Sequence, residues 1–158
     1  GIGNGIPLAA VTTTREIAEK LASRIHFNTF GGNPVSMAQG LAVLDVIDEE
    51  SLQENAKNVG NLILEGLRKL QEQFPLIGDV RGKGLMLGIE FVRDRQTKEP
   101  ANTETAQIIE EAKNMGVLLG KGGLFGNVIR LKPPMCMTKD DAEYLLHVLG
   151  ECLTKAGK

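Results

Sequence analysis

The sequence has few of the residues from which metal sites and disulfide frameworks are built. Its 158 residues include only two cysteines, Cys136 and Cys152, and two histidines, His26 and His147. The cysteines lie far apart and form no Cys-x-x-Cys motif. This pattern argues against a structural zinc site and against a disulfide framework, so we expect no metal ligands and a reducing compartment.

Long apolar runs and an excess of one charge are also lacking. No run approaches the roughly 20 apolar residues that a membrane helix needs, and no N-terminal signal pattern is present. The net charge of −2 gives no general attraction to nucleic acid or to an anionic membrane. With 42% hydrophobic and 24% charged residues, the composition is typical of a soluble globular protein. We therefore expect neither nucleic acid nor a membrane as a partner.

Glycine, in contrast, is plentiful, with 19 residues. The glycines gather in four places, where they mark backbone turns: residues 1–5, 31–32, 82–88 and 116–126. The chain opens inside the first of these groups, without methionine. We expect it to be part of a longer protein.

The stretch from Phe27 to Pro34 combines two glycines with a helix start. Gly31 and Gly32 allow positive φ, Asn33 is a good N-cap, and Pro34 fits the first helical turn. A helix start offers unpaired N–H groups to an anion such as phosphate, and the Thr29 hydroxyl can donate to the same anion. A plain turn between an extended segment and a helix explains the same residues, so local chemistry leaves both interpretations open.

Periodicity predicts the remaining elements. Apolar residues at helical spacing predict helices from about Thr14 to Ser23, Pro34 to Glu50, Ser51 to Phe74, Glu104 to Met115, and Thr138 towards the C-terminus. In the fourth of these helices, we expect Ala106, Ile109, Ala112 and Met115 to face inward. Alternating or β-branched runs predict strands at 6–12, 77–81, 85–92, 117–119 and 127–132, with a hairpin turn at 82–84 and a flexible glycine loop at 120–123.

From residue 51 onward the predicted order is helix, hairpin, helix, strand, strand, helix. This order predicts an α+β layer, a small and mainly antiparallel sheet with helices on one face. We therefore expect residues 51–158 to form a small C-terminal domain. Residues 1–33 complete no such layer on their own, and we expect residues 1–50 to be the end of a larger domain and a connecting helix.

Arg130 lies in the apolar strand segment from Val128 to Leu131. An arginine in such a run either pairs with a carboxylate or points outward. Its planar group of donors at the end of a strand also suits bidentate binding of a carboxylate. The residues alone leave these possibilities open.

Four motifs in order resemble the class III (subgroup II) aminotransferases, which are pyridoxal-phosphate-dependent enzymes of fold type I. The similarity covers essentially the whole chain and is closest to the alanine–glyoxylate aminotransferase 2 type. The motifs are Gly1–Gly5 followed by Pro7, Asn28–Pro34, Gly78–Met86 and Val128–Pro134.

The resemblance implies an α/β fold overall, with this chain supplying the end of the large cofactor-binding domain (1–50) and the small domain (51–158). It implies pyridoxal 5'-phosphate as cofactor, amino-acid and 2-oxo-acid substrates, a homodimer or tetramer, and a mitochondrial location. Thr29 matches the threonine that binds the cofactor phosphate in the neighbouring subunit. Arg130 matches the arginine that holds the substrate α-carboxylate. The implied reaction transfers an amino group from alanine to glyoxylate and gives pyruvate and glycine.

The family's Schiff-base lysine directly precedes the first motif, so it would precede Gly1. No catalytic residue of the family is therefore expected in this chain, and the isolated fragment should be inactive. Two alternatives remain. The first is an ornithine, acetylornithine or 4-aminobutyrate aminotransferase of the same class, and the second is a non-catalytic folded module for dimerisation or binding.

Overall fold

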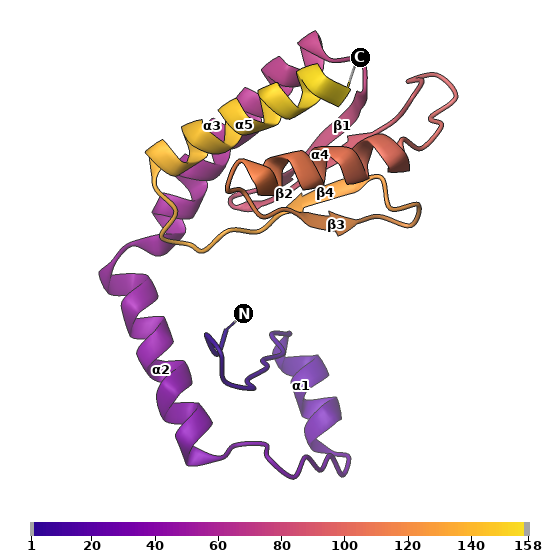
Figure 1. Cartoon of the computed structure of the whole chain (residues 1–158). Coiled ribbons are helices and arrows are strands. Elements are labelled where there is room, and N and C mark those ends of the chain that lie inside the picture. The colour runs from indigo at the N-terminus through magenta and orange to yellow at the C-terminus, as the bar shows by residue number, and fades with distance from the viewer. Residues whose placement is uncertain (1, 157–158) are drawn as a thin grey trace. The chain divides into compact units, whose positions relative to one another are not determined.

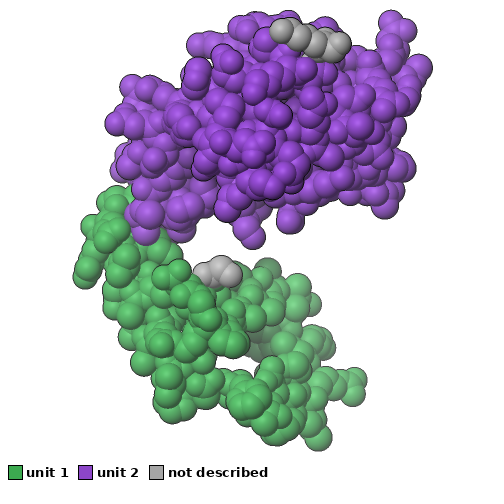
Figure 2. All heavy atoms as spheres, in the orientation of Figure 1, with its two compact units in different colours: residues 1–51 green, residues 52–158 purple. Residues whose placement is uncertain are grey.

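The computed structural model of the chain describes residues 2–156. The chain divides into two compact units, residues 1–51 and residues 52–158 (Figure 2). No helix among the described residues is both long enough and apolar enough to cross a membrane.

The second unit is built on a four-stranded sheet. Its strands are β1 (Ile77–Lys83), β2 (Met86–Phe91), β3 (Gly120–Gly122) and β4 (Val128–Leu131), in the order β1-β2-β4-β3. All neighbouring strands are antiparallel. The predicted antiparallel sheet and the hairpin are confirmed. Because Lys83 pairs with Met86, the hairpin turn lies at Gly84 and Leu85, later than the predicted 82–84.

Three helices cover one face of this sheet (Figure 1). Helix α3 (Leu52–Gln73) packs on β1 and β2, and α4 (Asn102–Asn114) packs on β2, β3 and β4. Helix α5 (Lys139–Ala156) lies against α3 and α4. The unit is thus the α+β layer that the order of elements predicts.

The core lies between the helices and the inner face of the sheet. Along β2, Leu87, Ile89 and Phe91 are buried, and Gly88 and Glu90 between them are not. The period of two that predicts this strand therefore also gives its buried face. The largest fully buried side chains from the other elements are Ile63, Leu67, Ile77, Ile108, Ile129, Leu149 and Leu153.

Two predictions in this unit are wrong in detail. Residues 117–119 are irregular, and the strand is instead β3, in the segment predicted as a flexible loop. Pairing of Lys121 with Ile129 of β4 satisfies this backbone despite the low strand propensity of glycine. In α4, Ala106 is exposed, and the buried positions are Thr105, Ile108 and Ala112.

The first unit contains α1 (Arg15–Ala22) and α2 (Pro34–Glu49), close to their predicted bounds. The strand predicted at 6–12 is wrong, because residues 7–14 are irregular. Pro7 lacks an N–H group, and the described residues of this unit contain no other strand with which to pair. Thr14 caps α1 without a side-chain hydrogen bond.

Among the described residues of the first unit, only Gly3, Ser36 and Gly40 are buried. Large apolar side chains remain exposed on both helices and on the segment between them: Ile17, Leu21, Ile25, Phe27, Phe30, Val35, Met37, Leu41, Leu44 and Val46. The unit therefore has no apolar core of its own. Its assignment to a larger domain stays a prediction.

Helix α3 passes close to the hairpin turn at Gly60. A Cβ atom at this position would lie 2.2 Å from the carbonyl oxygen of Gly84. Since backbone cannot move aside as a side chain can, we expect Gly60→Ala to lower the free energy of unfolding by about 1–3 kcal/mol in urea titrations.

Gly150 in α5 is the matched control, because its nearest neighbour would be Leu70 Cδ2 at an ordinary 3.6 Å. Gly150→Ala should be neutral or stabilise the chain by up to about 1 kcal/mol, since alanine favours helix. Equal effects of the two substitutions would contradict the close approach of α3 to the turn.

Candidate functional site

The turn before α2 uses positive φ at only one of its two glycines, since Gly31 does not have it. Gly32 has a φ of +70°. The Gly31 N–H donates to the Asn28 carbonyl oxygen at 3.0 Å, and the Phe30 N–H donates to Asn28 Oδ1 at 3.1 Å. The chain therefore reverses within residues 29–32 and enters the helix at Pro34.

Asn33 caps this helix, as predicted. Its Oδ1 accepts from the Ser36 N–H at 2.9 Å, and its Nδ2 donates to the Phe30 carbonyl oxygen at 2.9 Å. Pro34 has no N–H, and the Met37 N–H already donates to the Asn33 carbonyl oxygen. Of the first-turn donors, the Val35 N–H remains, so the helix start offers an anion less than the sequence predicts.

Thr29 lies exposed at the beginning of the turn. Within residues 2–156, its hydroxyl and its N–H have no acceptor, and neither has the Gly32 N–H. These donors fit the oxygens of a phosphate. Because they belong to one exposed turn, they fit one side of such a group and do not enclose it. Residues from elsewhere would have to complete the site.

Arg130 lies on the face of the sheet opposite the helices. Its neighbours Ile129 and Leu131 are 0% and 4% exposed, so alternation turns Arg130 outward. Its side chain is exposed, and no carboxylate of residues 2–156 lies within ion-pair distance. Of the possibilities that the sequence leaves open, the structure has the outward one, with the guanidinium unpaired among the described residues.

A second arginine lies on the same face. Arg81 of β1 pairs with Gly88 of β2, and Gly88 pairs with Arg130 of β4. Arg81 donates hydrogen bonds to the carboxylates of Asp79 and, at 2.8 Å, Glu90, and these bonds raise the pKa of Arg81 above its ordinary value. The two arginines thus differ, because carboxylates neutralise Arg81. Alternation along β1, with Val80 buried between Asp79 and Arg81, could have predicted from the sequence that both side chains lie on this face.

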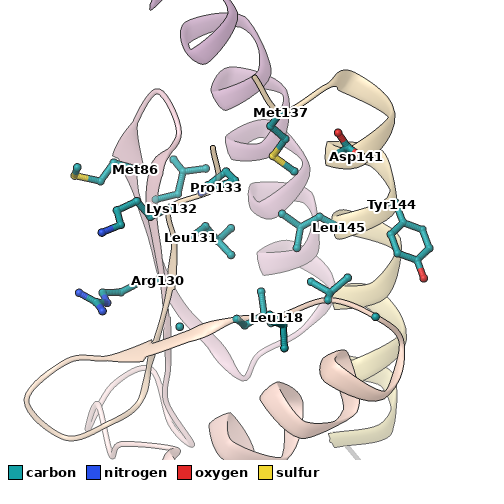
Figure 3. A pocket seen from close by; sticks show the side chains of 15 residues that line it. Met86, Leu118, Arg130, Leu131, Lys132, Pro133, Met137, Asp141, Tyr144 and Leu145 are labelled. Carbon is teal, nitrogen blue, oxygen red and sulfur yellow. The ribbon is translucent and has the colours of Figure 1, made fainter. Parts of the chain in front are cut away.

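A pocket of about 710 Å³ borders Arg130 on the other side of β4. Figure 3 shows the side chains of Met86, Arg130 and Lys132 on one side of the strand and those of Tyr144 and Leu145 on the other. The pocket is lined mainly by apolar side chains, among them Leu118, Leu131, Met137 and Leu145. Arg130 therefore lies at its border, and its charged end is available on the open face of the sheet.

Thr29 belongs to the first unit and Arg130 to the second. Thr29 offers hydrogen-bond donors, Arg130 offers a guanidinium with no ion pair among the described residues, and the phosphate and carboxylate assigned to them stay predictions. The pattern of the residues alone assigns neither ligand.

Comparison with known proteins identifies the family. The family model described as Aminotransferase class-III matches residues 1–153. The chain belongs to the class-III aminotransferases. This agrees with the four motifs and with the α+β architecture of residues 52–156.

Among curated relatives, the chain is 57% identical over 98% of its length to "Alanine--glyoxylate aminotransferase 2 homolog 2, mitochondrial" of Arabidopsis thaliana. It is 50% identical over 98% of its length to "Alanine--glyoxylate aminotransferase 2, mitochondrial" of Homo sapiens. It covers 32% and 30% of these proteins, respectively. The chain thus spans about a third of the length of the curated relatives it matches.

Solved structures of transaminases have the same fold. A PLP-bound amine transaminase from an uncultivated Pseudomonas species has a TM-score of 0.87 at 35% identity, over 99% of this chain and 37% of that one. A phospholyase from Arthrobacter, in complex with phosphoethanolamine, has a TM-score of 0.87 at 37% identity, over 97% of this chain and 36% of that one. Proteins with different named activities therefore share this architecture with the chain.

Proposed function

We propose that the full-length protein is a pyridoxal-phosphate-dependent aminotransferase that transfers an amino group from alanine to glyoxylate. The observation that carries the proposal is the 57% identity over 98% of the chain to a relative named for this reaction. A second relative at 50% identity has the same activity in its name. The proposal concerns a protein of the relatives' length, because this chain spans about a third of them.

Arg130 binds the substrate carboxylate in this proposal. A guanidinium can donate two parallel hydrogen bonds to a carboxylate. These bonds fix the orientation of the bound amino acid, and the positive charge of the guanidinium balances the negative charge of the carboxylate. The exposed position of Arg130 and the lack of an ion pair within residues 2–156 support this role. By holding the carboxylate, Arg130 directs the α-carbon and the amino group of alanine toward the cofactor.

Thr29 binds the cofactor phosphate across a homodimer interface in this proposal. The one-sided donors of the turn support a site completed by another chain. The exposed apolar side chains of the first unit, such as Phe27 and Leu41, supply surface for contacts with the rest of the protein or with a second subunit. When bound, pyridoxal phosphate supplies the electron sink on which amino-group transfer depends.

The same relatives have "mitochondrial" in their names, so the proposal includes a mitochondrial location. The alternative is that the full-length protein is an amine transaminase or an omega-transaminase. Solved structures with this fold are described as an amine transaminase and as an (S)-enantioselective omega-transaminase, and the chain is 35% and 34% identical to them. The choice of substrate is therefore the part of the proposal that an assay has to decide.

The assay compares amino donors and acceptors on the full-length protein. We expect alanine with glyoxylate to give a kcat/KM at least tenfold above that of ornithine with 2-oxoglutarate. Glycine and pyruvate are measured as products. A preference for ornithine, acetylornithine or 4-aminobutyrate would replace the proposed substrates. If no pair supports transfer, the proposal that the protein is an aminotransferase is wrong.

Removing the guanidinium should weaken the binding of the substrate carboxylate. We expect Arg130→Ala in the full-length protein to lower kcat/KM for alanine by about 30- to 1,000-fold, which corresponds to roughly 2–4 kcal/mol. Arg130→Lys keeps the charge without the planar group of donors, so its kcat/KM for alanine should lie between those of the wild type and Arg130→Ala. Arg68→Ala, which removes an exposed arginine from α3, should leave the kinetics unchanged. Wild-type kinetics for Arg130→Ala would exclude the assigned role.

Removing the Thr29 hydroxyl should weaken the binding of the cofactor phosphate. We expect Thr29→Val to raise the Kd of pyridoxal phosphate by about 10- to 160-fold, because one hydrogen bond to a charged group, worth about 1.5–3 kcal/mol, is lost. The Kd is measured by absorbance titration of the cofactor-free full-length protein. Thr13→Val, another exposed threonine of the first unit, is the control. An equal Kd in both variants would remove Thr29 from the phosphate site.

A further inference from the structure

The Arg130 side chain lies directly against the backbone of the edge strand β3. A Cβ atom at Gly122 would lie 2.8 Å from Cδ, 3.0 Å from Cγ and 3.1 Å from Nε of Arg130. These three atoms would be its nearest neighbours, and all of them belong to Arg130. The space that a side chain at 122 would fill is thus occupied by the stem of the arginine.

The backbone at Gly122 does not itself require glycine. Gly122 does not have a positive φ, unlike Gly116, Gly123 and Gly126. It lies within the pairing of β3 with β4, opposite Val128. Another residue could adopt this conformation, so the missing Cβ matters here for the space that it leaves to Arg130.

We propose that Gly122 is a positioning residue for Arg130: it lets the arginine stem lie flat over β3 and so sets where the guanidinium meets a substrate carboxylate. The inference rests on the proposed function. Arg130 has no ion pair within the described residues to fix its end, whereas Arg81 on the same face is held by Asp79 and Glu90. Packing of the stem therefore has to supply the order that carboxylates supply to Arg81.

The consequence is specific to substrates that carry a carboxylate. A methyl group at 122 would push the stem away from β3 and move the guanidinium, because contacts below 3.0 Å cannot persist. Small displacements of a binding group are costly to catalysis, up to about 100-fold for roughly 1 Å. A primary amine without a carboxylate does not use this contact, so its rate should not change.

The test uses Gly122→Ala in the full-length enzyme. We expect kcat/KM for alanine to fall about tenfold, mainly through KM, with no change for a primary amine that lacks a carboxylate. Gly88→Ala is the matched control, because Gly88 lies on the same face of the sheet, in β2 on the other side of β4. Its Cβ would lie 3.8 Å from Val128 Cγ1, which is an ordinary contact. Equal kinetics for the two alanine variants would overturn the inference.

A double-variant cycle decides whether Gly122 acts through Arg130. In the Arg130→Ala background, the clashing stem is gone, so Gly122→Ala should cause no further loss of kcat/KM and no loss of thermal stability. A further loss in that background would overturn the inference. If Gly122→Ala alone fails to fold, a folded double variant supports the inference and an unfolded one contradicts it.

The inference and the proposed function fail differently. If Arg130→Ala leaves the kinetics unchanged, the carboxylate site itself is wrong. If Arg130→Ala has its expected effect while Gly122→Ala behaves like Gly88→Ala, the carboxylate site stands and only the positioning role of Gly122 is lost.

Discussion

Burial of Ile129 and Leu131 against the helices is the constraint on which the candidate site depends. A strand that buries both residues must turn the intervening Arg130 to the opposite face. No helix of residues 52–156 lies over that face, so within this unit it can present a charge without the cost of burying one. The hairpin of β1 and β2 extends the same face and places the neutralised Arg81 beside Gly88. The core thus decides which charges the sheet presents.

In the first unit, local hydrogen bonds of Asn28 and Asn33, and not a hydrophobic core, determine the conformation of the turn before α2. Asn33 uses most of the donors that begin α2, and so the positive end of the helix is largely satisfied by the chain itself. What remains for a phosphate is the side of the turn that carries Thr29. Most apolar side chains of residues 52–156 build a core, and the exposed large ones there are Met86, Leu118, Leu124, Phe125 and Tyr144, whereas the first unit has no apolar core among its described residues.

The sequence predicts the helices and the hairpin well, because long periodic runs such as Leu52–Gln73 and Met86–Phe91 determine their own buried faces. It predicts β3 poorly, since Gly120–Gly122 becomes a strand only through pairing with β4. The buried face of α4 includes Thr105, whose hydroxyl donates to the Ala101 carbonyl oxygen, a contact that hydrophobic periodicity cannot reveal. The outward direction of Arg130 needed the structure, and the ligands assigned to Arg130 and Thr29 came from family resemblance.

The most direct test of the central claim is a crystal structure of the full-length protein with a bound amino-acid or 2-oxo-acid carboxylate. The account predicts that this carboxylate accepts two hydrogen bonds from the Arg130 guanidinium at about 2.7–2.9 Å, with the arginine stem lying over Gly122. A carboxylate bound elsewhere, with Arg130 paired to an acidic side chain of the protein, would contradict it.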